Sequence, residues 1–195
     1  YMESFEQAKN NINLLRASNS NWKMGDRSEA VKMLEDWLKE YPDDNLVRLD
    51  LANRYIALDR NAEAIASYRE IIKSSPKNIV ALNNLSWLLQ DTKPEEALQF
   101  ANQASTLAPQ STELKDTLAM ALLSTGDAAQ AQRVIDTVLD KRPDNLTYRY
   151  HKALILNKQG KSKQASVELK TIIDRNVDFP EKKEAEALYS TIRGE

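Results

Sequence analysis

The spacing of apolar positions predicts a chain built of short amphipathic helices. Between residues 51 and 71, apolar side chains recur at three- and four-residue intervals in two successive runs, which is the period of one helix face. The polar turn 59–61 separates the two runs, and Ser74, Ser75 and Pro76 follow the second run. Pro76 lacks the backbone N–H that a helix interior needs, so it marks a helix boundary. This segment therefore predicts a helical hairpin.

The same hairpin pattern repeats along the chain. Four of the six prolines recur with a nearly constant spacing, and three of the four glycines and a column of alanines keep the same phase. These positions are Pro42, Pro76, Pro109 and Pro143; Gly25, Gly126 and Gly160; and Ala30, Ala64, Ala97, Ala131 and Ala165. Small residues also recur in the first helices, at Ser18, Ala52, Ser86, Ala119 and Ala153. These two small columns predict close packing within each hairpin.

A helical hairpin that repeats with a period of about 34 residues resembles the tetratricopeptide repeat (TPR). The resemblance implies an all-α TPR α-solenoid, a right-handed superhelix of helical hairpins. Five units are expected, at residues 11–44, 45–78, 79–111, 112–145 and 146–176. Residues 1–9 keep the spacing of a second helix, and we expect them to be the remnant of a preceding repeat. The amphipathic segment 181–193 is expected to be a C-terminal capping helix.

Composition and charge narrow the possible functions. The 195 residues carry a net charge of −2, one histidine and no cysteine, and no apolar run approaches the length of a membrane span. The net charge therefore excludes a basic surface for nucleic acid, and the lack of cysteine excludes thiol chemistry. The glycines are isolated in turns, so no phosphate-binding loop is expected. We expect a protein that is not an enzyme, with no catalytic residues, metal site or cofactor.

The predicted binding surface is the concave groove that first helices line in such arrays. Side chains that face it should recur once per repeat. The two columns of candidate partner-binding residues are Arg16, Asp50, Asn84, Thr117 and His151, and Asn19, Asn53, Trp87 and Met120. Amides and an exposed indole suit a protein or peptide partner, although a concave face is also polar simply to stay soluble. A carboxylate clamp is rejected, because Leu49, Glu113 and Thr117 stand where it needs cations.

Several motifs point to a narrower family. They are Met33-Leu34-Glu35-Asp36-Trp37-Leu38, Ala81-Leu82-Asn83-Asn84-Leu85-Ser86-Trp87, Tyr148-Arg149-Tyr150-His151 and Phe179-Pro180-Glu181. In this order they resemble the C-terminal part of the TPR-repeat lipoproteins of PEP-CTERM/exosortase sorting systems in Gram-negative bacteria. The resemblance implies a cell-envelope protein on the periplasmic side, lipid-anchored through an upstream segment. A cytoplasmic location is the alternative. Lys152 departs from the pattern, since an apolar residue is expected there, and predicts a looser fifth repeat or a docking point.

Two functions remain open at this stage. The favoured one is a non-catalytic protein–protein interaction scaffold that binds a peptide or partner domain in the groove. The family resemblance links it to bacterial surface-protein sorting or exopolysaccharide export. The alternative is the repeat arm of a larger enzyme such as a glycosyltransferase, against which the mixed polar column argues. We also expect self-association through the N-terminal edge, where Phe5 and Leu14 would face a missing neighbour.

Overall fold

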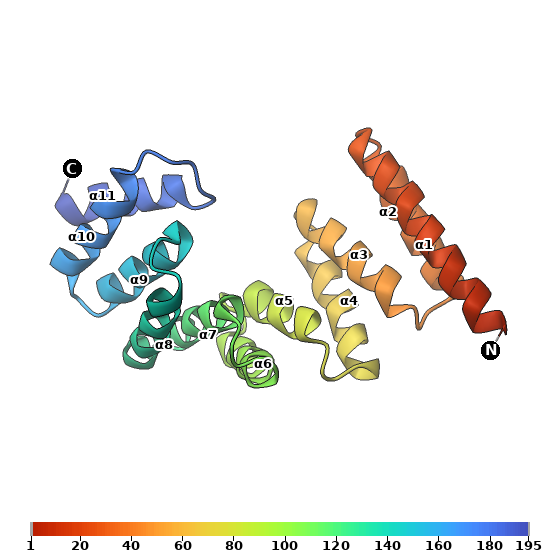
Figure 1. Cartoon of the computed structure of the whole chain (residues 1–195), viewed down its shortest axis with the longest axis horizontal. Coiled ribbons are helices and arrows are strands. Elements are labelled where there is room, and N and C mark those ends of the chain that lie inside the picture. Colours follow the sequence, from red (N-terminus) through yellow and green to blue (C-terminus); the bar gives the residue numbers. More distant parts are fainter. Residues whose placement is uncertain (1, 195) are drawn as a thin grey trace. The chain divides into compact units, whose positions relative to one another are not determined.

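The computed structural model describes residues 2–194, with side chains from residue 10 onward, and is all-helical within that range (Figure 1). This confirms the all-α class. The helices are α1 (Met2–Lys23), α2 (Arg27–Glu40), α3 (Asn45–Ala57), α4 (Asn61–Ser74), α5 (Ile79–Leu89), α6 (Pro94–Leu107), α7 (Thr112–Ser124), α8 (Ala128–Lys141), α9 (Leu146–Lys158), α10 (Ser162–Ile173) and α11 (Lys182–Arg193).

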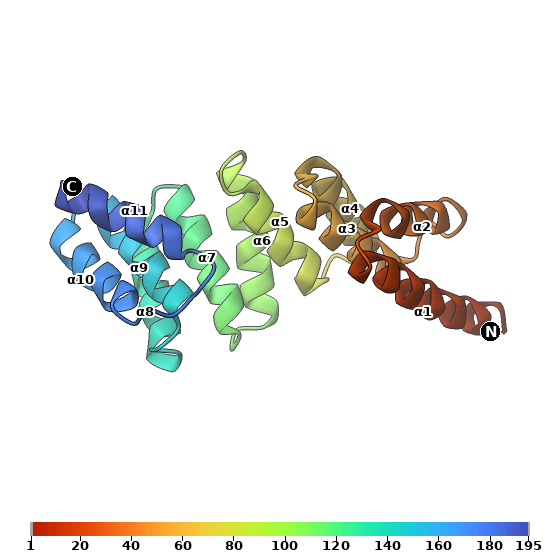
Figure 2. The same cartoon turned by 90° about the horizontal axis from the view of Figure 1, so that it is seen from above.

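The chain divides into two compact units, residues 1–85 and 86–195, and the boundary between them falls within helix α5. In the first unit, α1 packs on α2, α2 on α3, and α3 on α4. In the second unit, each helix from α6 to α11 packs on the next one along the chain. Figures 1 and 2 both show α3 and α4 side by side. Contact between sequence neighbours is the arrangement expected of stacked hairpins.

The N-terminal helix differs from the sequence-based expectation. Helix α1 runs without a break from Met2 to Lys23, so no turn separates the predicted remnant at 1–9 from the first predicted unit. The physical reason is local, because the first glycine of the chain is Gly25 and the first proline is Pro42. The side chain of Phe5 lies outside the described side chains, so the predicted apolar edge is not described there.

Four of the five turns inside the hairpins, at Gly25, Asp59, Gly126 and Gly160, share one C-terminal helix cap. At Gly126 the backbone takes φ of 92°, its N–H donates to the carbonyl of Leu123, and the next N–H donates to Leu122. This is the Schellman pattern, which places a residue in the left-handed region where glycine avoids the Cβ clash. Asp59 takes the same conformation, with φ of 57°, in the second hairpin, where no glycine occurs. The repeat therefore keeps the turn geometry rather than the residue.

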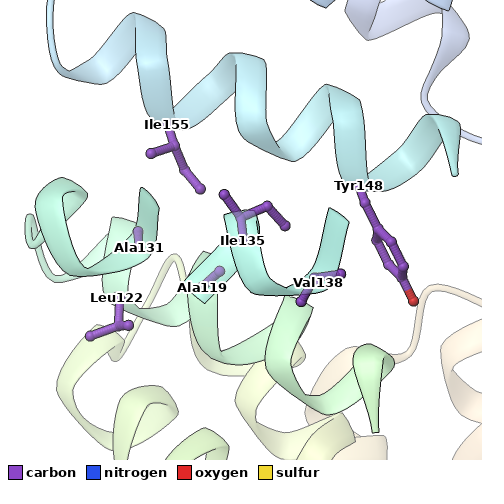
Figure 3. Close-up of a cluster of buried hydrophobic side chains, with 7 residues drawn as sticks. All are labelled: Ala119, Leu122, Ala131, Ile135, Val138, Tyr148 and Ile155. Atoms are coloured by element: carbon purple, nitrogen blue, oxygen red, sulfur yellow. The ribbon is translucent and has the colours of Figure 1, made fainter. Parts of the chain in front are cut away.

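The two small columns form the contact inside each hairpin, as predicted. All five alanines of the second helices and all five small residues of the first helices are fully buried. Larger side chains then fill the space between neighbouring hairpins. Figure 3 shows one such cluster, in which Ile135 and Val138 of α8 lie between Ala119 of α7 and Ile155 of α9. A larger side chain in a small column would overpack it, at a cost of about 1–3 kcal/mol.

Two tryptophans of the first unit, Trp22 and Trp37, have structural roles. The Trp22 ring contacts two guanidinium groups, with its centroid 5.4 Å from the guanidinium carbon of Arg27 and 5.0 Å from that of Arg54. The Trp37 indole N–H donates to Asp44 at 3.0 Å. At the other end, α11 packs on α10 and buries Ala185, as expected for a capping helix.

Candidate functional site

A groove of about 520 Å³ lies between α1 and α3 in the first unit. Its two walls carry residues that are one repeat apart in the sequence, because each wall is the first helix of a hairpin. The lining consists of four apolar and four polar residues: Ile12, Leu15, Leu46 and Leu49, with Arg16, Asn19, Asp50 and Asn53. The structure thus brings together four of the nine predicted binding residues in one place.

The two charged side chains that line this groove differ in whether they already have an ion-pair partner. Asp50 is already paired, because the Arg54 Nε donates to its carboxylate at 2.7 Å across one turn of α3. The Arg54 side chain is buried beneath the groove, with 7% of its area exposed. Arg16 is exposed and has no ion-pair partner among the described residues. The groove therefore presents one available positive charge and one neutralised negative charge.

A tyrosine from a second helix orients the groove amides. The hydroxyl of Tyr68, on α4, donates to Asn53 Oδ1 at 2.7 Å and accepts from Asn84 Nδ2 at 2.7 Å. This chain of bonds fixes which way each amide points. The Asn53 amide nitrogen is left toward solvent, whereas the Asn84 nitrogen is used internally. Burial raises the pKa of the Tyr68 phenol, and the bond from Asn84 acts in the opposite direction. Asn84 is thus partly a structural residue, which the sequence prediction did not anticipate.

The other predicted site residues belong to the second unit and are described there. Trp87 is 54% exposed near the end of α5. His151 lies 2.8 Å, from Nδ1, from the carboxylate of Asp116, which fixes the imidazole between α9 and α7. The Thr117 hydroxyl donates to the Glu113 carbonyl of its own helix, and Met120 is half-buried. Two of these four candidates, His151 and Thr117, therefore already have hydrogen-bond partners in the fold.

Lys152 takes part in an ion-pair network rather than standing free. Its Nζ lies 3.0 Å from Asp136 on α8 and 3.7 Å from Glu168 on α10. Arg149 also pairs with Glu168, at 2.8 Å. The lysine thus replaces an apolar contact by charges that link three successive helices. This assigns Lys152 a structural role in the fifth repeat.

Sequence reasoning missed the apolar half of the groove and its supporting residues. Ile12 and Leu46 line it and are 45% and 52% exposed. Their spacing by one full repeat was the available signal. By contrast, no local pattern indicates Tyr68 or Arg54 as partners of the groove residues, because both are buried and their contacts come from packing.

Two further features concern clusters of metal-ligating side chains and long apolar helices in the described part of the chain. There, no group of three or more acidic, histidine or cysteine side chains is placed to hold a metal ion. None of the described helices combines the length and apolar character that crossing a bilayer requires.

Comparison with known proteins agrees with this architecture. Sequence models of the tetratricopeptide repeat match residues 15–79 and 88–155, which together make up more than half of the chain. The chain belongs to the tetratricopeptide-repeat family. A TPR repeat-containing protein of Pseudomonas aeruginosa is 28% identical over 123 residues, covering 61% of this chain. The chain spans about a fifth of that relative's length, since the match covers 20% of it.

Solved structures of low sequence identity share the fold. A tetratricopeptide repeat protein from Parabacteroides merdae gives a TM-score of 0.81 at 15% identity, covering 92% of this chain and 70% of the other. MamA from Desulfovibrio magneticus gives 0.74 at 16% identity, covering 85% and 96%. YrrB, described as a TPR protein with an unusual peptide-binding site, gives 0.68 at 18%, covering 89% and 90%. These similarities show the TPR solenoid fold.

Proposed function

We propose that this chain is a non-catalytic scaffold that binds an extended peptide segment of a protein partner in the groove between α1 and α3. The observation that carries the proposal is the composition of that groove. Exposed aliphatic side chains and unpaired hydrogen-bond donors lie together on α1 and α3. The columns of buried small residues hold these two helices in place. Such surfaces bind peptides through apolar anchors and bonds to the backbone. The peptide-binding description of YrrB, a structural neighbour, supports the same function.

The groove amides define the test. A double substitution of Asn53 and Asn84 would remove both hydrogen-bond partners of the Tyr68 hydroxyl. It would therefore lower stability as well, and weaker binding could not be attributed to the groove alone. Arg16→Ala/Asn19→Ala is cleaner, because both side chains are exposed and lie in the groove. The matched control is Lys163→Ala/Gln164→Ala, which also removes one cation and one amide from an exposed helix surface.

The measurement uses a peptide selected from a random displayed library against the full chain, then synthesised and titrated by fluorescence anisotropy. We expect the Arg16/Asn19 double variant to weaken binding about tenfold or more, since each lost bond contributes about 0.5–1.5 kcal/mol. The control variant should bind as the parent does, and circular dichroism should be the same for all three. Parent-like binding by the groove variant would contradict the proposal.

The wider role rests on the motif resemblance. We propose that the longer protein acts at the cell envelope in surface-protein sorting or exopolysaccharide export, lipid-anchored through an upstream segment. The relative in Pseudomonas aeruginosa, a protein about five times the length of the match, supports a larger repeat protein. Fractionation of the full-length protein in its host tests this: recovery in the soluble cytoplasmic fraction would contradict it.

We also propose self-association through the N-terminal edge, where Leu14 of α1 is half-buried. Light scattering over a concentration series tests it. A mass that stays monomeric at every concentration would contradict this proposal.

A further inference from the structure

The groove residues of the first unit form rows that cross the helices. Three exposed aliphatic residues, Ile12, Leu46 and Val80, occupy equivalent positions of α1, α3 and α5, each one repeat after the last. They are 45%, 52% and 51% exposed. We call them the aliphatic row. Four residues further along each helix comes the polar row, Arg16, Asp50 and Asn84. Because residues four apart share one helix face, each helix presents an aliphatic and a polar side chain together.

The aliphatic row is confined to the first three repeats. The equivalent positions of the next two repeats hold Glu113 and Thr147. Their side chains bond within the chain, Glu113 to the Ser111 hydroxyl and Thr147 to Glu181. A single exposed aliphatic residue needs no explanation, but Ile12 and Leu46 line one groove together, and paired exposed apolar side chains of this kind mark an interaction site. Val80 repeats their position on α5.

The charges beside the row indicate the chemistry of its occupant. Asp50 is neutralised by Arg54 at 2.7 Å, whereas Arg16 has no ion-pair partner among the described residues. The Asn53 oxygen is occupied by Tyr68, so this side chain offers its N–H groups to the groove. The polar side of the groove therefore presents donors and a net positive charge. A carboxylate is the complementary group.

The spacing of the row indicates the conformation of the occupant. Helices α1 and α3 are in contact, and packed helices lie about 8–10 Å apart. A polyproline II segment returns the same face every three residues and advances about 9.3 Å in doing so. Aliphatic side chains three residues apart would therefore meet Ile12 and Leu46.

Building on the function proposed above, we infer that the occupant is an extended acidic segment of a partner protein, with aliphatic side chains three residues apart over Ile12 and Leu46 and a carboxylate at Arg16. The aliphatic side chains supply the apolar contact and the carboxylate fixes direction. An amphipathic helix or a polar glycan would not match both the row spacing and the charge.

The test starts from peptides selected against the full chain from a random displayed library. We expect enrichment of Leu, Ile or Val at three-residue spacing with Asp or Glu nearby. A synthetic peptide of the enriched sequence should bind Leu46→Ser about tenfold more weakly, because half-exposed aliphatic area is no longer buried. Leu46→Met should retain binding, since it keeps an apolar side chain. Val167→Ser is the matched control, because Val167 is 66% exposed on α10.

The carboxylate is tested by pairing two changes. Replacing the peptide's acidic residue by its amide should weaken binding to the parent and have little further effect on Arg16→Gln, the coupling expected of a direct contact. If Arg16→Ala/Asn19→Ala weakens binding but Leu46→Ser does not, the inference is overturned while the groove function stands. If no groove variant weakens binding, or no peptide is enriched, both are overturned.

Discussion

Equivalent residues of the repeat do not have equivalent surroundings, and the two buried serines show this. Ser18 and Ser86 occupy the same column of the first helices, and both are fully buried. The Ser18 hydroxyl donates to the Ala30 carbonyl at 2.7 Å, across the hairpin. The Ser86 hydroxyl has no hydrogen-bond partner in the described part of the chain. A buried hydroxyl without a partner costs about 1–3 kcal/mol.

Substituting these serines by alanine should therefore change the free energy of unfolding differently. Ser18→Ala removes a bond and should lower the free energy of unfolding by about 1 kcal/mol. Ser86→Ala removes an unsatisfied group of nearly the same size and should leave the free energy unchanged or raise it by about 1 kcal/mol. Urea denaturation followed by circular dichroism measures both. Equal losses in the two variants would show that the serines are equivalent after all.

At the scale of the helices, the positions that face a neighbour were predictable and their partners were not. The repeat period predicted the buried small columns correctly, because each recurs and can be checked several times along one chain. It also predicted four polar side chains that line one groove, Arg16, Asn19, Asp50 and Asn53, although their role in binding stays a prediction. Asp116 beneath His151 and Tyr68 beneath Asn53 come from other helices, so their contacts depend on packing that periodicity does not contain. The uninterrupted α1 was missed because the expected turn rested on spacing alone, without a helix-breaking residue.

The buried phenol of Tyr68 predicts that the stability of the protein depends on pH. Burial raises the pKa of Tyr68 above its value in the unfolded chain, about 10. Above that pH the folded state keeps a proton that the unfolded state has released, so stability present below about pH 10 is lost as the pH rises further. Burial also raises the pKa values of Tyr148 and Tyr150, so the parent should lose stability through several tyrosines.

The variant Tyr68→Phe isolates one share of this effect. It should be less stable than the parent by about 1 kcal/mol near neutral pH, because two hydrogen bonds are lost. Its stability should then fall less steeply than that of the parent above about pH 10. Urea midpoints at a series of pH values measure the two slopes. Identical slopes would mean that Tyr68 ionises with the same pKa in the folded and unfolded chain.

At the scale of the whole chain, helices contact mainly their neighbours in sequence within each of the two units. In repeat arrays of this kind, stability is close to a sum of local terms, and unfolding can be local. The cluster around Ile135 illustrates the scale, because it is contributed by α7, α8 and α9 alone among the buried residues (Figure 3). A defect there should stay in the second unit.

Ile135→Ala tests this locality. Truncating a fully buried isoleucine should cost about 2–5 kcal/mol. Hydrogen exchange followed by mass spectrometry should show faster exchange in α7, α8 and α9, with protection in α2 and α3 close to that of the parent. A uniform loss of protection over both units would instead indicate one cooperative fold.

The burial of the small columns has a consequence for how such a chain can change. The residues that hold a hairpin together, such as Ala64 and Ala52, are fully buried, whereas Ile12, Arg16 and Leu46 are exposed on the groove side of the first helices. Substitutions in the second set leave the packed contacts of the first intact. Ligand preference can therefore drift, or be redesigned, one surface position at a time without passing through an unfolded intermediate sequence, and a single solenoid can serve unrelated partners in different lineages.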